Sequence, residues 1–177
     1  MRIISGSLGG RRLHPPSDLP LRPTTDFAKE ALFNVLNNLV TYESLRVLDL
    51  FAGTGSISLE FVSRGAKAVT AVDNNPRCIG FMHKVSIDLK IPNLYPRKTD
   101  VFTFLKQVTV PFDLVFADPP YNLHNLVALP GIIFAGTILK TGGMFILEHP
   151  KRYDFTAQPH FSQHRKYGNV NFSFFAG

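Results

Sequence analysis

The chain has 177 residues but no tryptophan, only one cysteine, and few charged residues, which make up 18% of the total. Cys78 cannot form a disulfide within the chain, and a single thiol excludes a cysteine-rich zinc site. Such low cysteine usage is typical of proteins in a reducing compartment. The six histidines show no spacing that suits a metal site, so we expect no bound metal.

Long hydrophobic runs are also missing. The longest apolar stretch, residues 126–138, contains Pro130 and Gly131 and is shorter than the ~20 residues that span a bilayer. Residues 1–12 include arginines without an apolar run between them, which is unlike a signal peptide. These features predict a soluble, cytoplasmic protein without a membrane partner.

The composition does supply material for a core, since 45% of the residues are hydrophobic and 16 of them are phenylalanine. The length favours a single domain, which we expect to act as a monomer. Lysine and arginine exceed aspartate and glutamate by 19 − 13 = 6, which favours a polyanionic partner. We divide the chain into a basic arm and helix, residues 1–40, and a main domain, residues 41–177.

The first 23 residues are rich in glycine and proline and are expected to form an arm or small hairpin with turns. Thr24 or Thr25 could cap a helix that runs to about Leu39, because the apolar residues that follow fall on one helical face. The arm also carries four arginines that could contact a polyanion: Arg2, Arg11, Arg12 and Arg22.

From Arg46 onward, short apolar runs alternate with helical segments. Strands are expected at residues 47–51, 68–72, 94–98, 114–117 and 144–147. Helices are expected at residues 56–64, 76–89 and 101–107, with another from Pro130 to just before Gly142. Residues 160–167 and 170–175 flank a Gly-Asn turn, which indicates a terminal hairpin. This order predicts an α/β fold with a mostly parallel seven-stranded sheet that ends in an antiparallel hairpin.

The first motif with chemical content is Asp49-Leu50-Phe51-Ala52-Gly53-Thr54-Gly55, between a strand and a helix. Ligands bind at the carboxyl ends of the strands in such a sheet, and glycines let the backbone approach them. A plain tight turn is an alternative. A pyrophosphate loop is disfavoured, because the third glycine of that fingerprint would fall at Ser58. The carboxylate of Asp49 suits an ammonium group better than a phosphate.

Two further acids follow the next strands. Asp73 could accept hydrogen bonds from both hydroxyls of a ribose, because one carboxylate offers two oxygens. Asp100 could accept one from an adenine amino group. Either residue could instead cap the helix that follows it, although Asn75 could perform that role for the helix after Asp73.

The sharpest motif is Asp118-Pro119-Pro120-Tyr121, at the end of the fourth strand. Two prolines fix the backbone and remove two N–H donors, so mainly acceptors are left there. The Asp118 carboxylate and the Pro119 carbonyl could hold both hydrogens of an amino group, while the Tyr121 ring stacks on a planar base. A turn with a caged aspartate is the alternative.

Taken together, these motifs resemble those of class I S-adenosylmethionine methyltransferases that act on amino groups. The N-terminal part of the chain resembles one family in particular, the bacterial RsmD-type guanine-N2 methyltransferases of small-subunit (16S) ribosomal RNA. This resemblance lies in residues 2–6, 10–13, 21–26 and 29–34. The resemblance extends from residue 2 to about residue 148. It implies a Rossmann-like class I methyltransferase fold with a small N-terminal extension.

The resemblance also implies roles for single residues. S-adenosylmethionine would be bound by Asp49, Phe51, Ala52, Gly53, Gly55, Asp73, Asn74, Asp100, Val101 and Thr24, with Arg22 and Pro23 close by. Catalysis would fall to Asp118, Pro119, Pro120 and Tyr121. The partner would be small-subunit rRNA, naked or in the assembled small subunit. Its phosphates would be bound by Arg2, Arg11, Arg12 and Arg22, with Arg165 and Lys166 as further candidates.

The chain departs from the family pattern in three places. Residues 56–58 read Ser-Ile-Ser where a Gly- or Ala-rich start is usual, two asparagines follow Asp73, and the tail after His149 lacks acidic helices. None of these differences touches residues 118–121. They therefore affect the orientation of the ligand more than the type of reaction.

Other functions remain open at this point. The same tetrad type serves adenine-N6 methylation of DNA or RNA, and a related one serves methylation of protein glutamine. A nicotinamide oxidoreductase and a non-catalytic RNA-binding module are further alternatives. A cytosine-C5 methyltransferase would need a cysteine nucleophile beside the strand-end loop, whereas Cys78 falls in an expected helix.

Overall fold

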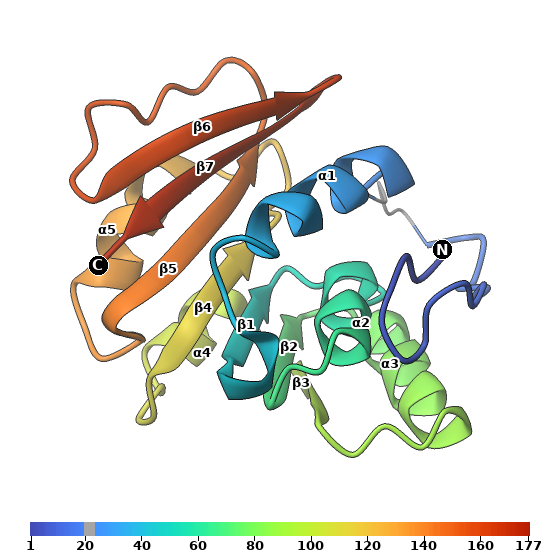
Figure 1. The fold of residues 1–177 in the computed structure, drawn as a ribbon. Helices are drawn as coiled ribbons and strands as arrows, with labels where there is room; N and C mark the ends of the chain where they lie inside the picture. The colour runs from blue at the N-terminus through green and yellow to red at the C-terminus, as the bar shows by residue number, and fades with distance from the viewer. Residues whose placement is uncertain (20–23) are drawn as a thin grey trace.

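A computed structural model describes residues 1–19 and 24–177, in which the strands form one seven-stranded sheet (Figure 1). The strands are β1 (Arg46–Leu50), β2 (Ala68–Asp73), β3 (Leu94–Lys98), β4 (Phe112–Ala117), β5 (Leu139–His149), β6 (Phe161–Tyr167) and β7 (Val170–Ala176). Their order is β3-β2-β1-β4-β5-β7-β6. The first five are parallel, and β7 runs antiparallel to both β5 and β6. The predicted α/β class and terminal hairpin are confirmed.

Helices cover both faces of the sheet. They are α1 (Asp26–Leu36), α2 (Ser56–Ser63), α3 (Pro76–Asp88), α4 (Val101–Leu105) and α5 (Leu129–Phe134), with short 3₁₀ helices at Tyr42–Ser44 and Leu126–Ala128. Apolar residues of α1, α2 and α3 pack on one face, and those of α4 and α5 pack on the other. Strands buried on both faces explain the continuous apolar runs in the sequence.

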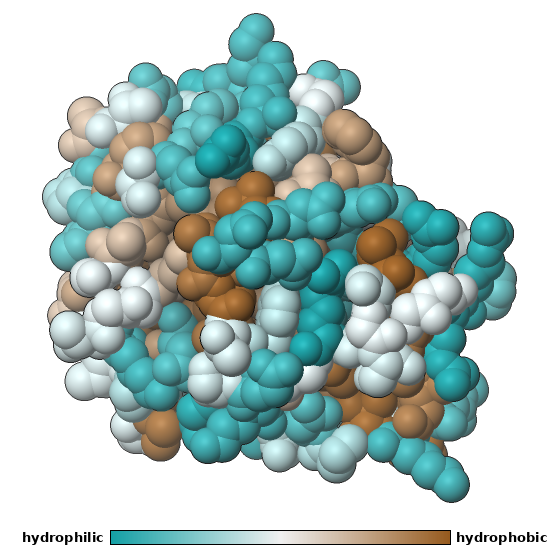
Figure 2. Space-filling model, viewed as in Figure 1, coloured by the Kyte–Doolittle hydropathy of each residue, from teal (hydrophilic) through white to brown (hydrophobic). Residues whose placement is uncertain are grey.

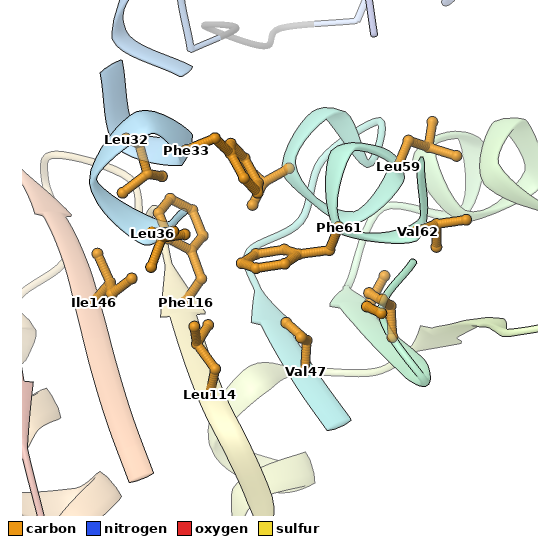
Figure 3. Packing of buried hydrophobic residues seen from close by; sticks show 14 of the residues in the cluster. Leu32, Phe33, Leu36, Val47, Leu59, Phe61, Val62, Leu114, Phe116 and Ile146 are labelled. Atoms are coloured by element: carbon orange, nitrogen blue, oxygen red, sulfur yellow. The ribbon is translucent and has the colours of Figure 1, made fainter. Parts of the chain in front are cut away.

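The alternation of side chains along β1 and β4 builds these two cores. Val47, Leu114 and Phe116 point toward α1 and α2, where Phe33 and Phe61 meet with ring centroids 4.8 Å apart (Figure 3). The residues between them in the strands, such as Leu48 and Val115, point to the opposite core. The central strands are therefore held rigidly from both sides, and their carboxyl ends are fixed in space.

The helix starts follow the expected capping chemistry. Thr25 accepts from the Ala28 amide at the start of α1, and Asn75 accepts from the Arg77 amide at the start of α3. The α1 helix ends at Leu36 rather than near Leu39. Overall, the predicted helices and strands are confirmed to within a few residues in most cases.

One predicted helix is wrong in its extent. The helix expected from Pro130 to just before Gly142 ends at Phe134, and β5 already begins at Leu139. The amide of Phe112 donates to the carbonyl of Ile138 at 2.8 Å, and Phe112 pairs with Leu139 across β4 and β5. Pairing with a neighbouring strand thus decided the conformation of this segment, and local pattern could not reveal it.

The N-terminal arm forms a small hairpin over residues 1–13. The Ile3 amide donates to the Arg11 carbonyl at 3.0 Å, and the Gly10 amide donates to the Ile3 carbonyl at 2.8 Å. Ile3 belongs to the same core as α1 and α2. The arm and α1 therefore pack against the sheet, and a boundary near residue 40 stays a prediction.

Candidate functional site

A cavity of about 790 Å³ opens at the carboxyl ends of β1, β2 and β4. Residues 15–17, Leu19 and the start of α1 form part of its wall, so the arm and the sheet enclose it together. Most of the predicted site residues line it: Thr24, Asp49, Phe51, Ala52, Gly53, Asp73, Asn74, Asp100, Val101, Asp118, Pro119, Pro120 and Tyr121. These residues come from five segments of the chain, four of which follow parallel strands whose carboxyl ends meet at one edge of the sheet.

Asp49 lies inside β1 and is 1% exposed. One carboxyl oxygen, Oδ2, accepts a hydrogen bond from the Ser58 hydroxyl at 2.5 Å. Burial raises the pKa of Asp49 to about 7, and the hydrogen bond from Ser58 opposes that rise. A buried carboxyl group of this kind gains most from a cationic ligand, which would restore its charge.

The glycine-containing loop turns sharply after β1. Phe51 and Gly53 have φ values of 58° and 54°, and the Ala52 amide donates to the Val72 carbonyl at 3.0 Å. Gly55 belongs to this loop, with a φ of 81°, but it is absent from the lining of the cavity. A Cβ atom at Gly55 would lie 2.6 Å from the Met82 sulfur, so this glycine allows α2 to approach α3 closely.

Asp73 fixes the loop from the neighbouring strand. Its Oδ2 accepts from the Gly53 amide and its Oδ1 accepts from the Asn75 amide, both at 2.8 Å. Each carboxylate oxygen has two lone pairs, so both oxygens can accept a further hydrogen bond from a ribose hydroxyl. Asn75, and not Asp73, caps α3.

Asp100 caps α4, because its Oδ1 accepts from the Thr103 amide at 2.8 Å and from the Thr103 hydroxyl at 3.0 Å. It also lines the cavity, so the capping and binding interpretations are compatible. Phe102, which the sequence did not single out, lines the cavity as well. Its ring meets that of Phe51 edge to face, with centroids 6.5 Å apart, and the two offer an apolar wall to a flat ligand.

The tetrad leaves β4 at the same edge. The Asp118 amide donates to the Leu50 carbonyl at 3.3 Å, which ties the turn to β1. Pro119 is buried, and the guanidinium of Arg152 donates to the Tyr121 carbonyl. Asp118 and Tyr121 line the cavity together with Asp49.

Glu148 is a site residue that motif reasoning missed. It is buried at the end of β5, lines the cavity, and accepts a hydrogen bond from the Thr24 hydroxyl at 3.3 Å. This contact joins the start of the α1 segment to the sheet. An acidic residue directly after the apolar run 144–147 was the signal that could have identified it.

The arginines of the arm are placed differently from one another. Arg2 and Arg12 lie opposite each other in the arm hairpin and line a second hollow of about 380 Å³ with Met1 and Asp26. Arg2 forms an ion pair with Asp26 at 3.3 Å, and Arg11 is exposed. Arg165 and Lys166 are exposed on β6. Arg22 and Pro23 lie outside the described residues.

The described residues offer neither a metal-binding cluster nor a reactive thiol. Within residues 1–19 and 24–177, no group of three or more histidine, cysteine, aspartate or glutamate side chains could hold a metal ion. Cys78 is buried in α3, and burial raises its pKa to about 11, which makes it a poor nucleophile. In the same part of the chain, no helix has the length and hydrophobicity needed to cross a membrane.

The residues of the large cavity fit S-adenosylmethionine. A buried carboxyl group, Asp49, suits an ammonium group, and Asp73 offers acceptors for hydroxyl groups. The Phe51–Phe102 wall suits a flat ring. Phosphate groups would fit poorly, because several carboxyl groups line this cavity: Asp49, Asp73, Asp100, Asp118 and Glu148.

Comparisons with known proteins agree with this geometry. A family model described as Conserved hypothetical protein 95 matches residues 1–176. The ribosomal RNA small subunit methyltransferase D of Buchnera aphidicola is 30% identical over 148 residues, which cover 84% of this chain and 75% of that protein. A solved structure, the putative methyltransferase yhhF from Escherichia coli, superposes with a TM-score of 0.86 at 28% identity, covering 99% of this chain and 97% of that one.

A third comparison concerns the fold alone. The T. thermophilus 16S rRNA N2 guanine methyltransferase (RsmC), solved with AdoMet and guanosine, superposes with a TM-score of 0.70 at 21% identity. That superposition covers 86% of this chain and 43% of the other. The chain therefore has a class I methyltransferase fold and belongs to the Conserved hypothetical protein 95 family, the family of the RsmD-type methyltransferases.

Proposed function

We propose that this protein transfers a methyl group from S-adenosylmethionine to the exocyclic N2 amine of a guanine in small-subunit rRNA. We further infer that it acts in the cytoplasm as a monomer, on naked RNA or on the assembled small subunit. The observation that carries the proposal is the convergence of Asp49 and the Asp118–Tyr121 tetrad in one cavity. The match to the family over nearly the whole chain supports it.

The cofactor half of the cavity lies at the ends of β1 and β2. Asp49 would pair with an ammonium group, and Asp73 would accept from hydroxyl groups while it holds the Gly53 amide. Val101, Phe102 and Phe51 would surround a flat ring, with Asp100 at its edge. When bound, S-adenosylmethionine supplies an electrophilic methyl group on a sulfonium sulfur.

The substrate half lies at the end of β4. The Asp118 carboxylate and the Pro119 carbonyl would accept the two hydrogens of the guanine amine. Tyr121 would stack on the base and fix its plane. An exocyclic amine is a poor nucleophile, because its lone pair is delocalised into the ring. Acceptors that pull on its hydrogens favour a pyramidal nitrogen. Its lone pair would form the new N–C bond to the methyl carbon as the bond from that carbon to the sulfonium sulfur breaks, and the amine would lose one proton to Asp118 or to water.

Positioning of the two reactants would account for much of the expected acceleration of methyl transfer. Holding an amine and its electrophile in line within one enclosed cavity can remove roughly 7–11 kcal/mol from a barrier. Pro119 is buried and Pro120 follows it directly, so two fixed φ angles make this side of the cavity rigid. Because proline has no N–H group, neither residue donates a backbone hydrogen bond at this point of the chain.

The test is methyl transfer from labelled S-adenosylmethionine to small ribosomal subunits and to naked small-subunit RNA, both from cells that lack this gene. The RNA is then digested and its labelled nucleoside identified. Labelled N2-methylguanosine would support the proposal. Label in N6-methyladenosine or in protein glutamine would show that the protein methylates a different substrate. Cofactor binding without transfer would indicate a non-catalytic RNA-binding module.

A further inference from the structure

A large aromatic side chain lies exposed next to the cavity. Phe27, in the first turn of α1, is 67% exposed. A helix that packs on a sheet ordinarily directs its phenylalanines inward, as α1 does with its buried Phe33. A single exposed apolar residue is ordinary on a protein surface. What distinguishes Phe27 is its place, because it is an aromatic ring in the first turn of a helix whose N-cap residue, Thr25, lines the cavity.

The ring of Phe27 is held by a partner from the other end of the chain. It meets the ring of Tyr167 edge to face, with centroids 6.3 Å apart and an interplanar angle of 82°. Tyr167 ends β6 and is itself anchored against the buried Phe172, at 6.2 Å between centroids. The tip of the β6–β7 hairpin thus reaches over α1 (Figure 1). The exposed ring is consequently oriented by the fold rather than loose on the surface.

Both members of this pair border residues of the large cavity. Thr25, two positions before Phe27, lines the cavity, and so does Val170, which pairs with Tyr167 across the hairpin. The aromatic pair therefore lies at the rim of the cavity. An RNA strand that places one nucleotide inside the cavity would carry its neighbouring nucleotides across this rim.

The surroundings of the pair favour a polyanion. Arg165 and Lys166 are exposed on β6, and Arg165 lies on the same face of the strand as Tyr167. The nearby Asp26 is compensated by its ion pair with Arg2. On the face shown in Figure 2, hydrophobic residues form separate patches within a largely hydrophilic surface. Such a surface suits a nucleic acid better than a large apolar protein interface.

We propose that Phe27, supported by Tyr167, is a second stacking platform that binds an unpaired RNA base beside the target nucleotide, while Arg165 contacts the adjoining phosphate. The inference rests on the proposed function, and it extends the RNA-binding surface beyond the cavity. Aromatic rings stack on any base, so the platform stabilises a locally opened strand without reading its sequence. It would help to keep the target guanine outside its RNA structure.

The test uses the binding of small-subunit RNA and of small subunits, measured apart from catalysis. Phe27→Ala and Phe27→Leu should each weaken binding about tenfold, because leucine keeps the hydrophobicity but cannot stack. KM for RNA should rise similarly with little change in kcat, and S-adenosylmethionine affinity should stay the same. Tyr95→Ala is the matched control, since Tyr95 is an exposed aromatic residue on β3, the opposite edge strand of the sheet.

A tryptophan variant gives a direct readout. The chain contains no tryptophan, so Phe27→Trp introduces the only indole, and it should bind RNA at least as well as the natural protein. Its fluorescence should be quenched by RNA as a base stacks on it. Arg165→Ala should lower the slope of log binding constant against log salt concentration by about one, as expected for one phosphate contact.

The outcomes separate this inference from the proposed function. The assignment of Phe27 as a stacking platform is wrong if Phe27→Leu binds RNA as the natural protein does, or if RNA leaves the fluorescence of Phe27→Trp unchanged. This holds even if Asp118→Ala abolishes methyl transfer. If only binding of assembled subunits depends on Phe27, the contact is with protein and the inference is overturned. If RNA binding depends on Phe27 but no guanine is methylated, the platform is supported and the proposed reaction is rejected.

Discussion

Asp49 and Asp118 reach the same cavity but meet different surroundings. Asp49 is enclosed within β1 and has its pKa raised to about 7 by burial, whereas Asp118 follows β4 in a turn and is only half-buried. A carboxyl group that resists ionisation is suited to respond to a cationic ligand. A more accessible one is suited to accept hydrogens from an arriving substrate.

Asp118→Ala should reduce methyl transfer by at least about 100-fold, because it removes one of the two acceptors for the amine. Binding of S-adenosylmethionine, measured by calorimetry, should stay within about threefold of the natural protein. Asp88→Asn, an exposed position on α3, serves as the control. Unchanged turnover in Asp118→Ala would refute the assignment of the tetrad.

Asp49 should make cofactor binding dependent on pH. Below its pKa of about 7 the carboxyl group is protonated, so the Kd for S-adenosylmethionine should rise about tenfold or more between pH 7.5 and pH 5.5. Asp49→Asn should bind weakly at both values and remove this dependence. An equally steep pH profile in the variant would show that another group is responsible.

The same carboxyl group should affect the stability of the cofactor-free protein in the opposite sense. Its folded-state pKa lies above the unfolded value of about 3.9, so folding takes up a proton between these pH values and ionised Asp49 is destabilising at pH 8. Asp49→Asn should therefore raise the free energy of unfolding by about 1–3 kcal/mol at pH 8. The gain should shrink toward pH 5.5, as measured by urea denaturation.

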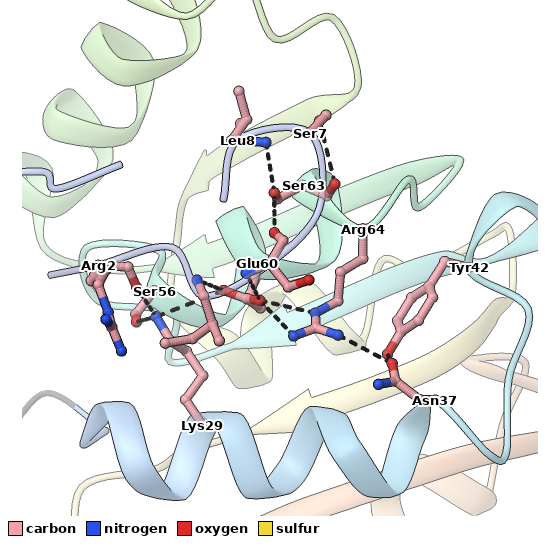
Figure 4. A network of polar contacts seen from close by, with 12 residues as sticks. Arg2, Ser7, Leu8, Lys29, Asn37, Tyr42, Ser56, Glu60, Ser63 and Arg64 are labelled. Carbon is pink, nitrogen blue, oxygen red and sulfur yellow. Dashed lines mark hydrogen bonds and ion pairs between the residues drawn. The ribbon is translucent and has the colours of Figure 1, made fainter. Parts of the chain in front are cut away.

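At the scale of elements, α2 connects the arm to the cavity. Glu60 of α2 is buried and accepts from the amides of Ile4 and Ser5 at 2.8 and 3.1 Å (Figure 4). It also pairs with Arg64 at 2.9 Å and lies 3.9 Å from the Lys29 ammonium of α1. Lys29 reaches the Ser56 hydroxyl at 3.1 Å, and Ser56 lines the cavity. Arm, α1 and cavity are thus joined by one polar network.

Glu60→Gln should lower the free energy of unfolding by about 3 kcal/mol, because it leaves the buried Lys29 and the half-buried Arg64 without their shared carboxylate. Burial already lowers the pKa of Lys29, which indicates how little solvent supports its charge. The matched control is Asp88→Asn, which breaks the exposed Lys84–Asp88 pair of the same i, i+4 type and should cost less than about 1 kcal/mol. Similar losses in both variants would contradict this role.

The helices and strands also show how much of the secondary structure can be predicted from local sequence patterns. Residues 94–98 form β3 and residues 76–88 form α3 nearly as their composition predicts, since apolar spacing and an N-terminal proline are local signals. The segment after Phe134 was assigned to a helix, but it leaves the helix and pairs with β4. The contacts of Glu60 with the arm link residues more than 50 positions apart, and no local signal encodes them.

At the scale of the whole molecule, exposed cations lie on both sides of the cavity. The arm hairpin and β6 carry exposed cations, and both lie beside elements that line the cavity. Binding of RNA should therefore weaken steeply with salt, because each phosphate contact releases counterions. Arm and hairpin would act as two parts of one RNA surface.

Replacing Arg11 and Arg12 by alanine should lower the salt slope of RNA binding by about two, one for each phosphate contact. Both residues are exposed, so the free energy of unfolding should change little. The control replaces Arg97 and Lys98, exposed cations on the edge strand β3, and should leave the slope unchanged. Equal effects of the two double variants would indicate diffuse attraction without a defined surface.

The sequence by itself determined the succession of strands and helices along the chain, the acidic loops at the strand ends and the similarity to the RsmD-type family. Those properties depend on local periodicity and on residues that lie within a few positions of one another. The roles of the single site residues stay predictions until they are tested.

Only the tertiary structure decided that Gly55 packs on Met82, that Glu148 joins Thr24 at the cavity, and that Phe27 meets Tyr167 at its rim. It also decided the pKa of Asp49, through the burial of a residue whose neighbours in sequence do not reveal it. These features depend on distances between residues far apart in the chain. Such distances are fixed by how the helices pack on the sheet, and no short segment carries that information.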